Sequence, residues 1–179
     1  MARATVATCS LAGCFGCHMS LLDIDERLVD LLELVEFDRS PLTDIKRLTR
    51  RVDIGLVEGG VCNAENVHVL REFRRMCAVL VAVGECANTG GIPSMRNGIP
   101  LRRCLEDSYV RGRGVENAQV PDDPELPLLL DKVRPLHHGV AIDHFLPGCP
   151  PSAEAIWYFL TALLAGRDPG LPARLIHFD

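Results

Sequence analysis

The sequence predicts an α/β fold, in which a parallel β-sheet is covered by helices on both faces. Short apolar runs rich in β-branched residues alternate with longer stretches whose apolar residues have helical spacing. Several of the short runs end at loops that contain glycine or cysteine. This alternation of strand, loop and helix is typical of parallel sheets with right-handed crossovers. The length of 179 residues favours one domain over residues 1–179.

The expected strands are short apolar runs, and those in the middle of the chain have the composition of strands buried on both faces. The expected helices carry apolar residues three or four positions apart, and two of them begin at Ser20 and Pro150, residue types that start helices. In chain order, we expect a strand over residues 5–9, helices over 20–35 and 42–48, a strand over 52–57, a helix over 63–76, a strand over 79–83, a helix over 102–110, a strand over 140–146 and a helix over 150–165. Residues 111–135 are rich in glycine, proline and aspartate, which predicts a long surface excursion.

The composition argues against nucleic-acid and membrane partners. The net charge is −5, from 19 basic and 24 acidic residues, and there is no basic stripe. No apolar run reaches the roughly 20 residues that a membrane-spanning helix needs. Leu11-Ala12-Gly13-Cys14 resembles a bacterial lipoprotein cleavage box, but the apolar stretch before it is short and interrupted by polar residues. We therefore expect a cytoplasmic chain, whose eight cysteines are thiols, metal ligands or catalytic groups rather than disulfides.

Four cysteines follow expected strands and should gather at one edge of the sheet. Cys14 and Cys17 follow the first expected strand, Cys86 the third and Cys149 the fourth. Ligands of open parallel sheets bind beyond the carboxyl ends of the strands, so these thiols can converge. Their loops contain glycine, which lets the backbone come close to a bulky bound group, and proline, which stiffens the loops that carry its ligands. A 4Fe–4S cluster needs four thiolates, and this set supplies them.

Three other interpretations of these cysteines remain open. A structural zinc site also uses four thiolates, although zinc ribbons usually pair two C-x-x-C knuckles and this chain has one. A thioredoxin-like thiol pair would use that motif and leave Cys86 and Cys149 without a role. Free cysteines are also often buried in the core, and we assign this packing role to Cys9, Cys77 and Cys104. Cys62, after the second expected strand, is either close to the cluster or a packing residue.

The order and spacing of four motifs resemble those of the small subunit of nickel–iron hydrogenases. The motifs are Cys14-x-x-Cys17, Val57-Glu58-Gly59, Gly84-x-Cys86-Ala87 and Pro147-Gly148-Cys149-Pro150-Pro151. The first motif is weak alone, but the four together are specific and span about residues 8–156. Residues 17–23 and 25–28 resemble the short small subunit of soluble, NAD-reducing (bidirectional) hydrogenases. The resemblance implies a flavodoxin-like fold and a proximal 4Fe–4S cluster on the four cysteines Cys14, Cys17, Cys86 and Cys149.

The resemblance also implies a function in electron transfer. The chain would relay electrons between the nickel–iron site of a separate large subunit and NAD-reducing diaphorase subunits, which hold further clusters and a flavin. It would then be a subunit of a hydrogen:NAD⁺ oxidoreductase, with no catalytic residue of its own. One cluster is implied, because most family members add a C-terminal domain with two more, whereas no cysteine follows Cys149 here.

Two residues beside the motifs carry further expectations. Glu58 ends an expected strand next to glycines, so it can contact the cluster, as a redox-dependent iron ligand, or the large subunit. Its alternative role is that of a solvated or helix-capping carboxylate. His18 and Met19 stand where many family members have Ser-Glu, so the glutamate of a family proton route is absent at that point. His18 can hydrogen-bond the cluster or a partner, or lie at the surface or in the packing.

Two other classes of function remain as alternatives. A flavodoxin-like or thioredoxin-like redox protein would use a flavin or a thiol pair, and FMN is the flavin to consider on this chain. The Ser/Thr-rich phosphate loop of flavodoxins is absent after the first expected strand, and Thr89-Gly90-Gly91 does not replace it. A pure interaction module would not need four convergent thiols.

Overall fold

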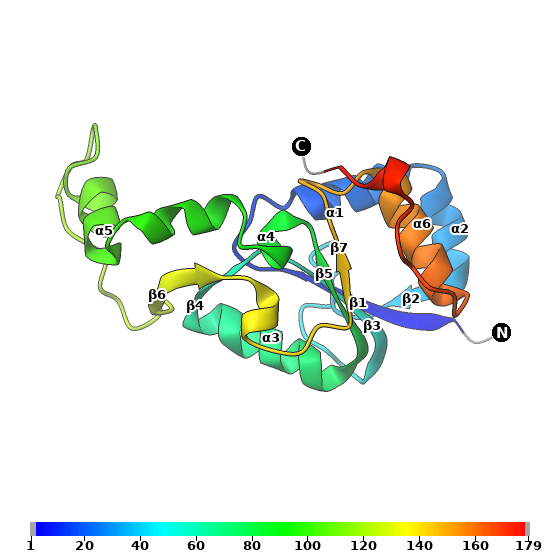
Figure 1. The fold of residues 1–179 in the computed structure, drawn as a ribbon. Coiled ribbons are helices and arrows are strands. Elements are labelled where there is room, and N and C mark those ends of the chain that lie inside the picture. Colours follow the sequence, from blue (N-terminus) through cyan, green and yellow to red (C-terminus); the bar gives the residue numbers. More distant parts are fainter. Residues whose placement is uncertain (1–2, 178–179) are drawn as a thin grey trace.

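The computed structural model describes residues 3–177, whose fold is shown in Figure 1. Within these residues, five parallel strands form one sheet with the order β2-β1-β3-β5-β7. The strands are β1 (Ala4–Ser10), β2 (Val35–Phe37), β3 (Val52–Glu58), β5 (Cys77–Val83) and β7 (His144–Leu146). Counted along the chain within this sheet, the order is 2-1-3-4-5, which is the flavodoxin arrangement. The flavodoxin-like α/β fold expected from the sequence is therefore confirmed.

Helices cover both faces of this sheet (Figure 1). The main helices are α1 (Gly16–Leu22), α2 (Arg27–Leu34), α3 (Ala64–Met76) and α6 (Ala153–Leu164). One buried cluster joins α1, α2 and α6 to the face that carries Val6 and Leu56, and a second joins α3 to the face that carries Ala7 and Val57. Successive residues of a strand point to opposite faces, so the neighbours Val6 and Ala7 belong to different cores.

Shorter elements lie beside the sheet or extend from it. β4 (Val61–Asn63) pairs with β6 (Leu129–Arg134) in a small antiparallel sheet. After β5 come α4 (Glu85–Asn88) and the 3₁₀ helix η1 (Ile92–Gly98). α5 (Leu101–Tyr109) lies at the end of an arm that extends from the body of the molecule (Figure 1). Two 3₁₀ turns, η2 (Leu136–His138) and η3 (Ala173–Leu175), complete the described elements.

One expected helix is wrong as a single element. Residues 20–35 form two helices, α1 and α2, and residues 35–37 form strand β2. The chain turns between the helices near Asp25, whose φ of 55° a continuing helix cannot accommodate. Ser20 does not cap a helix. It lies inside α1, where its hydroxyl donates a hydrogen bond of 2.5 Å to the carbonyl of Pro151.

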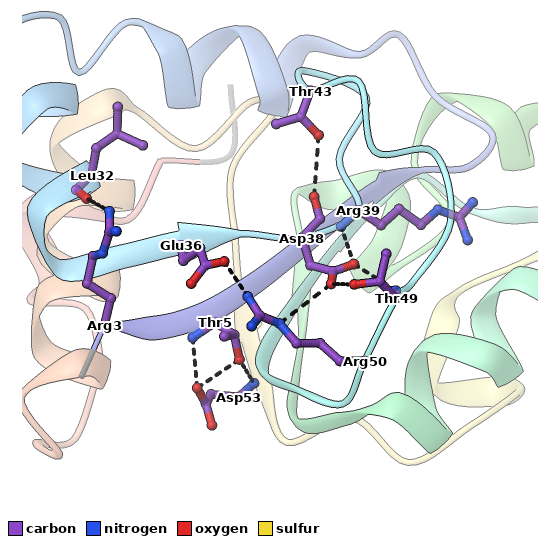
Figure 2. Close-up of polar contacts among 10 residues, drawn as sticks. All are labelled: Arg3, Thr5, Leu32, Glu36, Asp38, Arg39, Thr43, Thr49, Arg50 and Asp53. Atoms are coloured by element: carbon purple, nitrogen blue, oxygen red, sulfur yellow. Dashed lines mark hydrogen bonds and ion pairs between the residues drawn. The ribbon is translucent and has the colours of Figure 1, made fainter.

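The expected helix over residues 42–48 is also wrong, because these residues form turns and bends. The buried Asp38 explains the difference (Figure 2). Its carboxylate accepts hydrogen bonds from the backbone N–H groups of Arg39 at 2.7 Å and Thr49 at 3.0 Å, and from the Thr49 hydroxyl at 2.5 Å. The hydroxyl of Ser40 likewise accepts from a backbone N–H of this segment. These side chains hydrogen-bond the backbone at Arg39, Leu42 and Thr49 and so hold the segment in a turn, which competes with a helix.

The surface excursion expected over residues 111–135 and the strand expected over residues 140–146 are both shorter than expected. Residues 111–128 contain neither helix nor strand and are mostly exposed, but residues 129–134, expected in the excursion, form β6. β6 has a single buried residue, Val133, so its sequence lacks a strand pattern. The strand expected over residues 140–146 begins only at His144.

β1 lies between β2 and β3, so the stretch before the lipoprotein-like box is part of the core. Of the helices in the described part of the chain, none is long and apolar enough to cross a membrane.

Candidate functional site

The carboxyl ends of β1, β3, β5 and β7 form one rim, where the cysteine-bearing loops meet. One small cavity at this rim is lined by all four of the expected cysteines, Cys14, Cys17, Cys86 and Cys149. Cys14 and Cys149 are exposed, whereas Cys17 and Cys86 are partly buried, so the cavity reaches the protein surface. The strand order reverses between β1 and β3, which is the point where proteins of this fold bind ligands.

Glycines leave the space that the sulfur atoms occupy. A Cβ atom at Gly84 would lie 2.4 Å from Sγ of Cys17, and one at Gly91 would lie 3.0 Å from Sγ of Cys86. Both glycines have positive φ angles, 81° and 45°, which side-chain-bearing residues rarely adopt. These loops therefore need glycine for the path of the backbone and for room around the thiols.

The rim disfavours negative charge on its thiols unless a cation is present. Burial raises the pKa of the Cys17 thiol, and the carboxylate of Glu58 raises it further. Burial also raises the pKa of Cys86, and the thiols of Cys149 and Cys14 are close enough to add to this effect as thiolates. Four thiolates at this rim therefore need positive charge among them, which bound metal ions supply.

Glu58, at the carboxyl end of β3, lines the same cavity and is only 3% exposed. Its Oε2 accepts a hydrogen bond of 3.0 Å from the backbone N–H of Cys17, and its Oε1 lies 2.7 Å from Nδ1 of His18. Burial acts to raise the pKa of this carboxyl group, but hydrogen bonds from His18, Ser10 and Cys17 outweigh it and lower the pKa below its usual value. Glu58 is therefore not solvated, but it accepts an N–H of the first turn of α1, as the helix-capping alternative expected. A role as iron ligand stays a prediction.

His18 is 4% exposed, so the surface position considered for it is wrong. Its ring lies between Glu58 and Thr8 and stacks on the ring of Phe15, with centroids 4.7 Å apart and planes 3° from parallel. Phe15 directly precedes α1 and has a φ of 68°, which is uncommon for a residue other than glycine. Sequence reasoning missed Thr8, whose only signal is a hydroxyl within a mostly apolar strand.

The other cysteines do not line this cavity. Cys9 and Cys77 are buried in the core beneath α3, where burial raises the pKa of both thiols, that of Cys77 to about 12. Cys62 lies in β4 and Cys104 in α5, both partly buried. The positions of Cys9 and Cys77 agree with the packing role expected for them. Cys62 does not line the rim cavity, and its role stays a prediction.

The four thiols at the rim fit a metal group by their chemistry. Four thiolates are the donor set of a 4Fe–4S cluster and also of a structural zinc ion. Within residues 3–177, no three His, Cys, Asp or Glu side chains come close enough together to hold one ion. The four cysteines share one cavity, so a metal group at the rim would take its ligands from three loops.

Three comparisons with known proteins identify relatives of this chain. The family described as NADH ubiquinone oxidoreductase, 20 kDa subunit, matches residues 14–163. The delta subunit of the NAD-reducing hydrogenase HoxS of Cupriavidus necator is 47% identical over 177 residues, which are 97% of this chain and 85% of that subunit. The crystal structure of an NAD⁺-reducing [NiFe]-hydrogenase in the H₂-reduced state contains a chain that is 55% identical, with a TM-score of 0.96 over 99% of this chain and 100% of that one. The iron–sulfur subunit of the F420-non-reducing hydrogenase of Archaeoglobus profundus is 32% identical over 89% of this chain and 55% of its own length.

The fold and these matches define the class of protein: the chain belongs to the NADH ubiquinone oxidoreductase 20 kDa subunit family. Within that class it belongs with the small electron-transfer subunits of NAD-reducing nickel–iron hydrogenases, as the sequence motifs had suggested. The chain spans 85% of the HoxS delta subunit but only 55–59% of its relatives in archaeal F420-non-reducing hydrogenases.

Proposed function

We propose that the chain relays electrons between the nickel–iron site of a hydrogenase large subunit and NAD-reducing diaphorase subunits, through one 4Fe–4S cluster. Four thiolates would hold the cluster, those of Cys14, Cys17, Cys86 and Cys149. The observation that carries the proposal is that these thiols come from three separate loops and line one cavity at the carboxyl rim of the sheet. When bound, such a cluster accepts and releases single electrons.

The residues around the thiols would hold the cluster in a fixed position and tune it. The backbone N–H of Gly16 lies 3.4 Å from Sγ of Cys14, and hydrogen bonds of this kind stabilise negative charge on sulfur. Gly84 and Gly91 leave space next to two further sulfur atoms. Glu58 fixes the backbone at Cys17 from the side of β3. The chain thus supplies ligands, rigidity and local charge, while bond making and breaking would take place on another subunit.

The partners follow from the names of the relatives and from the surface beside the rim. The delta subunit of Cupriavidus necator is named as part of an NAD-reducing hydrogenase, which supports a large subunit and iron–sulfur/flavin diaphorase subunits as partners. Ile92 and Met95 of η1 are 68% and 73% exposed and lie just after the loop of Cys86. Such exposed apolar residues favour a protein partner over the rim. A cytoplasmic location completes the proposal. FMN stays an alternative cofactor that the flavodoxin-like fold allows and the missing phosphate loop disfavours.

An assembled complex tests this function. We would express the chain with its partner subunits, reduce the complex with hydrogen and follow iron–sulfur signals by electron paramagnetic resonance while measuring NAD⁺ reduction. Cys86→Ala should lose one 4Fe–4S signal and hydrogen-dependent NAD⁺ reduction. Cys77→Ala, a matched change in the buried core, should keep both. Wild-type rates of hydrogen-dependent NAD⁺ reduction in the Cys86→Ala complex would exclude the proposed relay.

A further inference from the structure

We infer that His18 is a positioning residue, which holds the carboxylate of Glu58 against the backbone of Cys17. This inference rests on the proposed function. If a cluster is bound by Cys17 and the other three cysteines, His18 keeps the negative charge of Glu58 at a fixed place beside it. His18 itself would not touch the cluster, and it acts through Glu58.

Four buried side chains and one backbone N–H form a continuous hydrogen-bonded chain. The backbone N–H of Cys17 donates to Oε2 of Glu58 at 3.0 Å, and Oε1 of Glu58 lies 2.7 Å from Nδ1 of His18. On the far side of the ring, Nε2 lies 2.8 Å from Oγ1 of Thr8, which in turn lies 2.8 Å from Oγ of Ser40. Their exposed fractions are 3% for Glu58, 4% for His18, 0% for Thr8 and 1% for Ser40. These groups therefore depend on one another rather than on bulk water.

The chemistry of the groups assigns the donor at the central contact. An ionised carboxylate only accepts hydrogen bonds, so Nδ1 of His18 carries the hydrogen that points to Glu58. A neutral ring leaves Nε2 to accept from the Thr8 hydroxyl, and a protonated ring donates to it. In both forms Nδ1 donates to Glu58, so the hold on the carboxylate does not depend on the charge of the ring.

The ring has little freedom to leave this position. Phe15 stacks on one face with almost parallel planes. Ser40 fixes Thr8 from the other end, because the Ser40 hydroxyl also accepts from the backbone N–H of Leu42 at 3.2 Å. The turn over residues 38–49 that Asp38 organises thus supports the histidine through two hydroxyl groups.

The surroundings determine where Glu58 would go without His18. Glu58 lines two cavities, the rim cavity that contains the cysteines and a second cavity whose remaining walls are largely apolar, such as Leu21, Leu56 and Ile156. An unpaired carboxylate is strongly disfavoured against apolar walls. Loss of the histidine donor would therefore leave the charge uncompensated and directed to the rim. A negative charge at the rim makes reduction of the cluster less favourable, so the reduction potential of the cluster should fall.

Two substitutions separate the two ring nitrogens. In His18→Asn the amide nitrogen can occupy the place of Nδ1 and keep the donor to Glu58. In His18→Gln the longer side chain places its amide near Nε2 and loses that donor. His68→Gln, on the exposed side of α3, is the matched control. Each variant is made in the full complex, its iron and sulfide are counted, and its cluster is titrated potentiometrically by electron paramagnetic resonance.

We expect His18→Gln to retain iron and sulfide, to titrate at a lower potential and to change the cluster spectrum, while His18→Asn and His68→Gln titrate like the wild type. In a Glu58→Gln background, His18→Gln should add no further shift, because coupled residues are not additive. If His18→Gln does not fold, His18→Leu serves in its place, since it also removes the donor to Glu58 and should shift the potential in the same direction. An unshifted potential in the folded variant, or an equal shift with and without Glu58, would overturn the inference. A wild-type complex without iron and sulfide on this chain would overturn the proposed function first, and the inference with it.

Discussion

The backbone N–H of Cys17 donates a hydrogen bond of 3.0 Å to the carboxylate of Glu58, across the point where the strand order of the sheet reverses. Cys17 follows β1, Glu58 ends β3, and these two strands are neighbours in the sheet. The contact places a buried negative charge among the thiols of the rim, where burial already disfavours thiolates. A bound group that carries positive charge resolves this conflict.

Gly84→Ala should prevent cluster binding. The new Cβ would lie 2.4 Å from Sγ of Cys17, and the φ of 81° is unfavourable for alanine. We expect loss of most of the iron and a fall in the free energy of unfolding of about 1–3 kcal/mol. Gly98→Ala is the control, because a Cβ there meets nothing within 4 Å. Full iron content and an unchanged Tm in Gly84→Ala would contradict the described rim.

Glu58→Gln should leave the cluster in place but change its oxidised state. A carboxylate oxygen is a harder ligand than sulfur, so it would bind iron best when the cluster is oxidised. We expect an altered electron paramagnetic resonance spectrum of the oxidised protein, or an altered rate of recovery after exposure to air. Glu65→Gln, on the surface of α3, is the control. Indistinguishable spectra and rates at matched potentials would remove Glu58 from the redox chemistry.

Asp38→Asn should destabilise the turn that replaces the expected helix over residues 42–48. Burial acts to raise the pKa of Asp38, but hydrogen bonds from Thr49 and Arg39 outweigh it and lower the pKa. A lowered pKa means that the ionised form contributes stability above the unfolded-state pKa of about 3.9, which is lost as the pH falls through the folded-state value.

The cost of Asp38→Asn should therefore be about 2 kcal/mol near neutral pH and constant down to about pH 5. Asp44→Asn, exposed in the same turn, should cost little. Chemical unfolding from about pH 7 to about pH 2 measures both variants against the wild type. A cost that stays unchanged as the pH falls below about 3.9 would show that the pKa of Asp38 is not lowered.

Met95→Lys should weaken assembly with the large subunit without unfolding the chain. Met95 is 73% exposed in η1, which follows the loop of Cys86, and a stable electron-transfer interface of this kind is expected to bury more than about 2,000 Å². A lysine within such an interface would be desolvated without a partner. Co-purification of the two subunits should fall at least about tenfold, equivalent to 1.4 kcal/mol. Val29→Lys, 64% exposed on α2, should co-purify normally, and equal effects of both changes would argue against an interface at the rim.

The sequence predicts the central strands and the rim for the same physical reason. Buried parallel strands such as β3 and β5 have continuous β-branched runs, which makes them recognisable in the sequence. The carboxyl ends of such strands lie at one edge of the sheet, so Cys14, Cys17, Cys86 and Cys149 could be assigned to one site from the sequence alone. β6 was not predictable, because only Val133 of its residues is buried.

The buried histidine network was also hidden in the sequence. Its contacts join His18 to residues 10 and 40 positions away, and no local pattern encodes such pairs. The turn over residues 38–49 was misjudged for a similar reason. Its helical spacing is real, but the side chains of Asp38 and Ser40 hydrogen-bond the backbone at both ends of the segment and hold it in a turn.

The most direct test of the central claim is the metal and sulfide content of the chain, purified without air together with its large subunit. Iron, acid-labile sulfide and zinc are measured per chain, with the Cys86→Ala complex as the blank for metal bound to other subunits. The account predicts that wild type exceeds the blank by about four iron atoms and about four sulfides, with no zinc. One zinc per chain without sulfide, or equal iron in wild type and blank, would contradict it.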